Sequence, residues 1–295
     1  MISLLQVLIL GLLLGGVYAL MASGLTLLFG VMRIVNLAHA ALILVAAYIT
    51  LLLFDRFGLD PILSALVTMP VMFGLGVGLY LLLFPRIEGS HRYVEMTVLL
   101  TFGVALIVEG LLAFIFTGIF RQARPGYVMD AFRFPIGDSQ LFVPTGQLYA
   151  MAVSLTLLAG LWVFLQLTRT GRAIRATTQN RAAAQIVGIN VRRISALAFG
   201  VGLALAGASG SLVSFIFPFF PSKHWQWIAL MLALIVLGGM GSIKGAVLGA
   251  LILAVAAAFV SDTFGATWSP IAFYLALFLI LLVRPQGFFG AKMRL

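Results

Sequence analysis

Nine long apolar runs constrain this chain more than any other feature of its sequence. Each is close to the length that a transmembrane helix needs, roughly 17 to 25 residues. Little more than Gly-Met-Gly-Ser-Ile-Lys separates the seventh run from the eighth, so one of these two can instead be a half-span or a re-entrant segment. The sequence predicts an all-α polytopic membrane protein with about eight or nine transmembrane helices. The runs cover residues 7–31, 37–54, 62–84, 96–120, 148–167, 194–217, 225–243, 245–261 and 267–283.

The composition supports this class and excludes several others. Hydrophobic residues make up 63% of the chain and charged residues 9%, whereas a typical soluble domain has about 25% charged residues. The net charge is +10, and the basic residues that produce it lie between the apolar runs. Membrane topology therefore explains this charge better than nucleic-acid binding does. Because the chain has no cysteine, disulfides, thiolate metal sites and cysteine catalysis are excluded. No metal site is expected.

The distribution of Lys and Arg predicts an orientation. With the N-terminus outside and residues 169–193 inside, the inner loops carry 13 of the 18 basic residues and the outer loops carry 5. Basic loops near the ends of spans stay in the cytoplasm. We therefore expect an external N-terminus, a cytoplasmic C-terminus, a cytoplasmic loop at 169–193 and an outer, periplasmic loop at 121–147.

Residues 169–193 form the most basic polar interruption of the chain. They hold six arginines and no acid. Ala and Arg favour helix, and Gly188 with Asn190 can end one, so a short basic helix is expected here. Two interpretations stay open: the helix is a topological anchor, or it receives a push from a partner protein.

The outer loop 121–147 is the other sizeable polar segment. Six Pro and Gly residues exclude a long helix within it. Apolar and charged residues alternate over 132–134, and 141–143 is apolar throughout, a pattern that suits a small hairpin or a surface helix. The loop is either a connector or a docking surface for a partner outside the membrane.

Small residues recur inside the apolar runs. Glycines stand four residues apart at 11 and 15, at 74 and 78, and at 241, 245 and 249. This spacing allows helices to approach closely. The segments 28–34 and 237–243 are also alike, and repeated halves are common in transporters, so an internal repeat is a further prediction.

The chain lacks the residues that some kinds of site require. A P-loop requires a Gly-Lys pair, and the chain has none, so it is not expected to bind ATP in that way. Glu109 is the one acid near the middle of a run; it is either a hydrogen-bonded structural residue or a residue facing a wet cavity. Asn36 and His39 share a helix face, where they either cap the second helix or line a path.

Four segments resemble the branched-chain amino-acid (Liv-type) ABC transporter permeases. Residues 16–39, which begin Gly-Val-Tyr-Ala-Leu-Met-Ala-Ser-Gly, resemble the first signature of that family. Thr-Gly-Arg-Ala-Ile-Arg-Ala at 170–176, leading to 187–190, resembles its cytoplasmic loop, and Val-Leu-Gly-Gly-Met-Gly-Ser-Ile-Lys-Gly-Ala at 236–246 resembles its third signature. Pro-Gln-Gly at 285–287 fits the usual Pro-x-Gly near the end. The resemblance covers essentially the whole length in the right order.

The resemblance implies that residues 1–295 form a single permease domain of a multi-chain importer. Its implied partners are two cytoplasmic ABC ATPases, a second related permease, a periplasmic solute-binding protein and membrane lipid. ATP and Mg²⁺ would bind to the ATPases, and this chain would hold no cofactor and be no enzyme. A helix from about Arg172 to Val187 would be the coupling helix that contacts the ATPase.

The resemblance also implies site residues. Those implied to couple to the ATPase are Gly171, Arg172, Arg175, Ala176, Asn180, Ala184, Gly188 and Asn190. The candidates for the translocation path are Tyr18, Asn36, His39, Glu109, Gly239 and Gly241. Two places depart from the family pattern: Ala40-Ala41 replaces a frequent Gly-Glu, and Gln179-Asn180 replaces an acidic pair, so the loop has lost its acids.

The sequence therefore predicts an ABC importer permease for branched-chain amino acids or closely related solutes, in a bacterial cytoplasmic membrane. Separate ATPases would drive it by alternating access. The alternatives are a urea or short-chain amide ABC permease and, from other classes, an ion-driven secondary transporter or a passive channel. The shortage of acids in the middle of the spans disfavours the ion-driven transporter.

Overall fold

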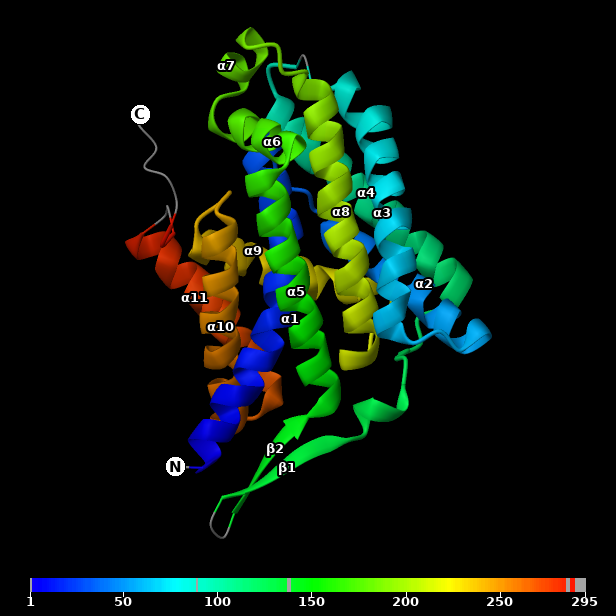
Figure 1. Ribbon diagram of the computed structural model, residues 1–295, viewed down its shortest axis with the longest axis vertical. Coiled ribbons are helices and arrows are strands. Elements are labelled where there is room, and N and C mark those ends of the chain that lie inside the picture. The colour runs from blue at the N-terminus through cyan, green and yellow to red at the C-terminus, as the bar shows by residue number, and fades with distance from the viewer. Residues whose placement is uncertain (1, 89, 137–138, 285–286, 290–295) are drawn as a thin grey trace.

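The computed structural model describes residues 2–88, 90–136, 139–284 and 287–289. In these ranges eleven α-helices form a bundle, most of them running along its long axis (Figure 1). The helices are α1 (Ile2–Met32), α2 (His39–Phe57), α3 (Pro61–Leu83), α4 (Tyr93–Phe116), α5 (Thr145–Leu167), α6 (Arg169–Gln179), α7 (Arg181–Ile186), α8 (Val191–Ile216), α9 (His224–Gly238), α10 (Ile243–Phe264) and α11 (Ser269–Val283). The short 3₁₀ turns are η1 (Phe84–Arg86), η2 (Gly126–Val128), η3 (Pro221–Lys223) and η4 (Ala266–Trp268).

Eight helical stretches of the described chain are long and apolar enough to cross a membrane. Helix α9 is not among them, and its 15 residues extend only about 22 Å at 1.5 Å per residue. Helix α11 has the same length, but the η4 turn before it lengthens that stretch to 18 residues. A bilayer has a hydrocarbon core about 30 Å thick. The seventh predicted run is therefore the half-span, and the prediction of an all-α polytopic membrane protein is confirmed.

Helix α4 ends earlier than the sequence predicted. The fourth apolar run extends to residue 120, but α4 stops at Phe116. Thr117 has a φ of 64°, a left-handed conformation that a β-branched residue rarely adopts. This turn ends the helix, and the apolar residues that follow it belong to the outer loop.

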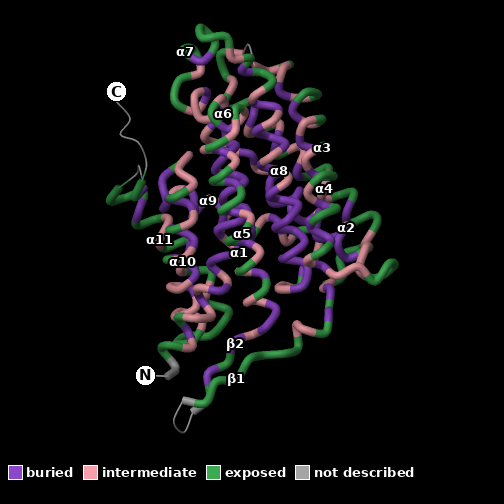
Figure 2. The backbone as a smooth tube through the Cα atoms, in the orientation of Figure 1, coloured by how far each residue is buried: buried purple, intermediate pink, exposed green. Residues whose placement is uncertain are grey.

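Helix α8 is the central helix of the bundle. It packs against α1, α2 and α3. Of its most apolar 18-residue stretch, 83% is buried. Figure 2 shows this helix largely in the colour of buried residues. Small residues permit the close packing: a Cβ on Gly207 would lie 2.7 Å from the carbonyl oxygen of Thr68 in α3. Such backbone approach is typical of glycine-rich interfaces in membranes.

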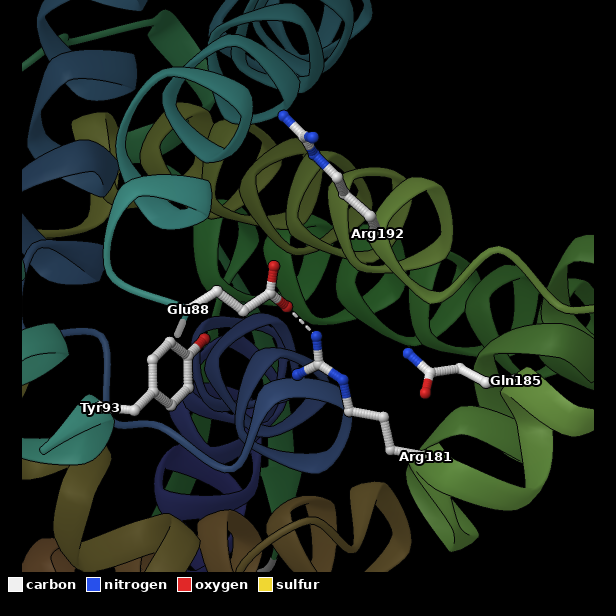
Figure 3. A pocket seen from close by; sticks show the side chains of 5 residues that line it. All are labelled: Glu88, Tyr93, Arg181, Gln185 and Arg192. Carbon is white, nitrogen blue, oxygen red and sulfur yellow. Dashed lines mark hydrogen bonds and ion pairs between the residues drawn. The ribbon is translucent and has the colours of Figure 1, made fainter. Parts of the chain in front are cut away.

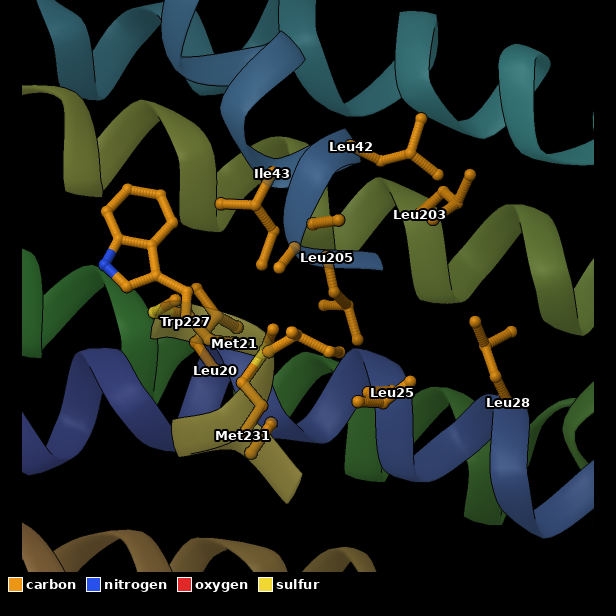
Figure 4. Close-up of a cluster of buried hydrophobic side chains, with 14 of the residues drawn as sticks. Leu20, Met21, Leu25, Leu28, Leu42, Ile43, Leu203, Leu205, Trp227 and Met231 are labelled. Atoms are coloured by element: carbon orange, nitrogen blue, oxygen red, sulfur yellow. The ribbon is translucent and has the colours of Figure 1, made fainter. Parts of the chain in front are cut away.

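Three buried hydroxyl groups join α8 to its neighbours. The Oγ of Ser211 lies 2.8 Å from Oγ1 of Thr50 in α2 and 2.8 Å from Oγ1 of Thr68 in α3. The hydroxyls satisfy one another inside an apolar bundle, where an unpaired one would be costly. The same bundle contains a large buried apolar cluster; Figure 4 labels Leu20, Met21, Leu25, Leu28, Leu42, Ile43, Leu203, Leu205, Trp227 and Met231 of it.

The outer loop contains the predicted hairpin rather than a surface helix. Strands β1 (Ala131–Ile136) and β2 (Ser139–Pro144) pair in antiparallel fashion, at the end of the molecule where α1 begins (Figure 1). The side-chain amide of Gln6 holds the hairpin to α1. Its Nε2 donates to the carbonyl oxygen of Phe142 at 2.6 Å, and the Phe142 N–H donates to its Oε1 at 2.8 Å.

A second contact ties the outer loop to α3. The Tyr127 hydroxyl donates to Oδ1 of Asp60 at 3.2 Å. The same carboxylate accepts from the N–H of Ile62 at 2.8 Å and so caps α3. Burial, with the Asp60 carboxylate beside it, raises the pKa of Tyr127 above its ordinary value. The loop is thus fixed to two helices rather than hanging free.

The chain after α11 completes the end of α9. The Phe288 N–H donates to the carbonyl oxygen of Leu237 at 2.9 Å, and the Phe289 N–H donates to that of Gly238 at 3.1 Å. The last carbonyls of a helix lack partners within the helix, so these bonds satisfy α9 from outside. Of the Pro-Gln-Gly motif, Gly287 has a φ of 71°, and residues 285 and 286 lie outside the described ranges.

The two similar segments 28–34 and 237–243 meet at the α9–α10 turn. A Cβ on Gly30 would lie 3.6 Å from the carbonyl oxygen of Gly241. Gly239 and Gly241 have φ values of 98° and 86°, which glycine adopts without steric cost. The segments are therefore in contact, while the internal repeat itself stays a prediction.

Candidate functional site

Helices α6 and α7 lie at the end of the molecule opposite the hairpin (Figure 1). The sequence predicted one helix from about Arg172 to Val187, and this is wrong in one respect, because the helix is broken at Asn180. Asn180 has φ −152° and ψ 106°, and its Oδ1 accepts from the N–H of Ala183 at 3.0 Å. Asn is favoured at this N-cap position, so a second helix starts there.

Further capping residues fix the shape of the α6–α7 loop, residues 168–190. Oγ1 of Thr168 accepts from the N–H of Gly171 at 2.9 Å and starts α6. Gly188, with a φ of 84°, ends α7. Oδ1 of Asn190 then accepts from the N–H of Arg193 at 3.0 Å and starts α8. Only residues 187–190 separate α7 from the central helix, so α7 and α8 are joined by a short link.

The residues predicted to couple to an ATPase differ in exposure. Four are exposed: Arg172, Asn180, Gly188 and Asn190. Two are buried, Gly171 and Ala184, and two are half-buried, Arg175 and Ala176. A buried residue can affect a partner only through the shape of the loop. The contacts themselves stay predictions.

The sequence analysis missed two exposed apolar residues of the loop. Ile186 and Val187 at the end of α7, here called the apolar tip, are 86% and 74% exposed. Exposed apolar groups rimmed by polar residues are typical of interaction sites. Two adjacent β-branched residues in an otherwise polar and basic segment were the signal that could have identified them.

A lateral contact links α7 to the loop between α3 and α4. Glu88 of that loop forms an ion pair with Arg181, the first residue of α7 (Figure 3). The pair borders a cavity of about 440 Å³, lined also by Tyr93, Gln185 and Arg192. Glu88 and Arg181 are 93 positions apart in the chain, so nothing in the local sequence indicates the pair.

The six predicted path residues lie in four separate places, with Asn36 beside His39 and Gly239 beside Gly241. Tyr18 lines a cavity of about 380 Å³ between α1, α9 and α11. Asn36 lies before α2, and its Oδ1 accepts from the N–H of Ala38 at 3.1 Å. Gly239 and Gly241 form the α9–α10 turn described above. Their role in a path stays a prediction.

His39 lies at a junction of three helices. It is fully buried at the start of α2, and a Cβ on Gly24 of α1 would lie 3.0 Å from its Nε2 and 2.8 Å from the carbonyl oxygen of Gly202 in α8. Neither ring nitrogen has a hydrogen-bond partner among the described residues. The ring therefore fills the space that two glycines leave.

Glu109 is hydrogen-bonded, as one of its two predicted interpretations requires. Its Oε2 accepts from Nε1 of Trp225 at 3.0 Å and lies 3.1 Å from Nε2 of His224. Both partners belong to the first turn of α9. Glu109 therefore fixes the start of the half-span to α4. Within the described ranges, no group of three or more His, Asp or Glu side chains is placed to hold a metal ion.

Comparisons with known proteins agree with this architecture. The family model described as "Branched-chain amino acid transport system / permease component" matches residues 7–283. The permease protein BraD of Pseudomonas aeruginosa is 29% identical, over 97% of this chain and 95% of its own length. LivH of Methanocaldococcus jannaschii, named a probable permease protein, is 30% identical over 92% of this chain and 88% of its own.

A third relative matches only part of this chain. LivM of Escherichia coli is 34% identical over 48% of this chain and 33% of its own length. All three relatives carry the words "branched-chain amino acid transport" in their names. No solved structure matches the chain. The eight spans and the match over 7–283 lead to one conclusion: the chain belongs to the family of permease components of branched-chain amino acid transport systems.

Proposed function

We propose that this chain is the permease subunit of a binding-protein-dependent ABC importer for branched-chain amino acids in a bacterial cytoplasmic membrane. The relatives BraD and LivH, which match nearly the whole chain, are named as permeases of such amino acids. Eight spans provide the framework for a path across the bilayer. Hydrolysis of ATP takes place on separate subunits, and this chain passes the resulting motion to the path.

The observation that carries the energy-coupling part of the proposal is the α6–α7 loop. The loop is basic and presents its apolar tip at one end of the bundle. Its last four residues, 187–190, join α7 to α8, the most buried of the candidate spans. In our proposal the apolar tip enters a groove of a cytoplasmic ATPase, and the exposed arginines pair with acids on its rim. Movement of the ATPase then shifts α7 and α8 together, which opens the path alternately to each side.

The proposal includes two further partners. A second, related permease completes the path, because relatives of this chain carry two different names, LivH and LivM. A solute-binding protein docks at the opposite end, where the hairpin and the outer loop lie (Figure 1). Lipid surrounds the remaining apolar surface.

Co-purification in mild detergent tests the docking step. The variant Ile186→Glu, Val187→Glu places two charges at the apolar tip, and we expect it to lose the ATPase while keeping the second permease. Phe57→Glu is the matched control, since Phe57 is 77% exposed at the far end of α2, and it should keep both. Recovery of the ATPase with the tip variant at wild-type yield would contradict the proposal.

Uptake tests the solute. The complete complex in proteoliposomes, with ATP inside and binding protein outside, should accumulate leucine, isoleucine or valine and should not accumulate urea. Uptake of urea alone would instead identify the protein as a urea or short-chain amide permease. Uphill uptake by the purified chain without any ATPase would refute the ABC mechanism altogether.

A further inference from the structure

The cavity beside Tyr18 lies where α9 and α11 begin. Its volume of about 380 Å³ falls within the roughly 300 to 1,000 Å³ that is usual for small-molecule sites. Residues from α1, η3, α9, η4 and α11 line it, so segments far apart in the chain contribute to one site. Such convergence distinguishes it from a gap along a single helix interface.

Aromatic rings form one part of this cavity. Tyr18 stacks on Phe217 with ring centroids 6.1 Å apart and planes 4° from parallel. The Phe273 ring meets Tyr18 edge-on at 5.9 Å, and Trp227 adds a side chain that is only 5% exposed. Rings that pack on one another keep their orientation, so these walls offer a preformed apolar surface.

Lys223 contributes the single charge of the lining. It is half-buried. Its backbone N–H donates to the carbonyl oxygen of Phe220, but its ammonium group has no hydrogen bond or ion pair with another described residue. The neighbouring acid, Glu109, is engaged with His224 and Trp225 instead. A half-buried cation without a counter-charge is stabilised by an anionic partner, so this position favours an anionic group on whatever enters the cavity.

We propose that this cavity binds the transported solute as a zwitterionic amino acid with an apolar side chain. The inference rests on the proposed function and adds the solute's binding mode. Lys223 receives the carboxylate, and the aromatic walls pack against the side chain. The ring faces and the amide oxygen of Gln226 attract the ammonium group. Urea and simple amides have no carboxylate, so the lysine selects against them.

Protection from a thiol reagent tests the site directly. The chain has no cysteine, so Ala266→Cys, at an exposed position of the lining, is the only reactive thiol of this subunit. In the complete complex, reconstituted with cysteine-free partners, millimolar L-leucine should slow its reaction with a methanethiosulfonate, and urea should not. Ala131→Cys on the hairpin, also exposed, is the matched control and should react at one rate throughout.

Lysine variants test the role of the charge. In the Ala266→Cys background, Lys223→Gln should weaken protection by leucine about tenfold, the scale of one charged hydrogen bond. Lys223→Arg keeps the charge and should retain protection within about threefold of the parent. Equal protection in the Gln and Arg variants would overturn the assignment of the carboxylate to Lys223.

The outcomes separate this inference from the proposed function. Normal leucine uptake with no protection of Ala266→Cys overturns the inference alone. A cysteine that stays unreactive in the complex, with or without leucine, overturns it too, because the second permease then covers the cavity. Absence of uptake of every branched-chain amino acid by the wild-type complex overturns the proposed function and the inference with it.

Discussion

Single glycines in α8 set how closely the central helix approaches its neighbours. A Cβ on Gly207 would lie 2.7 Å from the Thr68 carbonyl oxygen, and one on Gly200 would lie 2.9 Å from the Phe73 ring. The first obstacle is backbone, which cannot rotate away as a side chain can. By contrast, a Cβ on Gly74 of α3 would meet no atom within 4 Å.

We therefore predict that Gly207→Ala lowers the stability of the bundle by about 1–3 kcal/mol, the usual cost of overpacking. Scanning fluorimetry of the protein in detergent should show a lower Tm. Gly74→Ala is the matched control, and it should leave Tm unchanged or raise it, because Ala is the better helix former. Equal Tm values for both variants would contradict the close contact of α8 with α3.

The sequence alone does not separate such glycines. Gly11 and Gly15 have the same spacing as Gly74 and Gly78, yet only the first pair packs tightly, against α10. Spacing shows that two glycines share a helix face, and the partner of that face depends on tertiary packing. For the same reason the sequence could place His39 at the start of α2 but not against Gly24.

At the scale of the elements, α7 has two connections to the rest of the molecule. One is the short link to α8, and the other is the ion pair of Arg181 with Glu88. An ion pair this close to solvent adds less than about 1 kcal/mol to stability. Its effect is expected on the position of α7 rather than on folding, because it ties that helix to the loop before α4.

We predict that Glu88→Arg uncouples ATP hydrolysis from the binding protein, since two like charges would push α7 from its place. Stimulation of the ATPase by solute-loaded binding protein should fall about fivefold, with Tm changed little. The exchanged pair Glu88→Arg, Arg181→Glu should restore stimulation. Glu95→Arg, a reversal at an exposed acid in the first turn of α4, is the matched control. Failure of the exchange to rescue would refute the mechanical role of the pair.

Element boundaries could be predicted only where local chemistry decides them. The runs of apolar residues indicated the spans. Apolar residues alternating with a charged one, in a loop interrupted by Pro and Gly, indicated the hairpin. The break at Asn180 had a local cause too, its capping side chain, but alanines on both sides concealed it. The end of α9 has a local signal in Gly239, whose φ is 98°. Its contacts with Glu109 and with the Phe288 and Phe289 amides come from other segments, and the local sequence does not indicate them.

On the scale of the whole molecule, the two ends of the bundle differ in character. The α6–α7 loop and its arginines lie at one end, and the hairpin lies at the other (Figure 1). The sequence predicted that these loops face opposite sides of the membrane, and the structure places them at opposite ends. Which end faces the cytoplasm follows, in our proposal, from the excess of basic residues at the first.

Thiol labelling of intact cells should determine this orientation. We predict that an impermeant maleimide modifies Ala131→Cys in β1 but modifies Ala182→Cys in α7 only after the membrane is permeabilised. Both alanines are exposed, and the absence of native cysteine makes the cysteine-free parent the blank. Labelling of the α7 variant in intact cells would invert the topology and remove the basis for ATPase docking.

The bonds from Phe288 and Phe289 to the end of α9 have a consequence for biogenesis. A nascent chain that has just delivered α9 to the bilayer carries two carbonyl groups whose partners have not yet been synthesised. These two bonds form only after Phe289 has been synthesised, so the end of α9 reaches its final form late in synthesis. We expect a chain truncated just after α11 to insert and yet to leave the end of α9 incomplete.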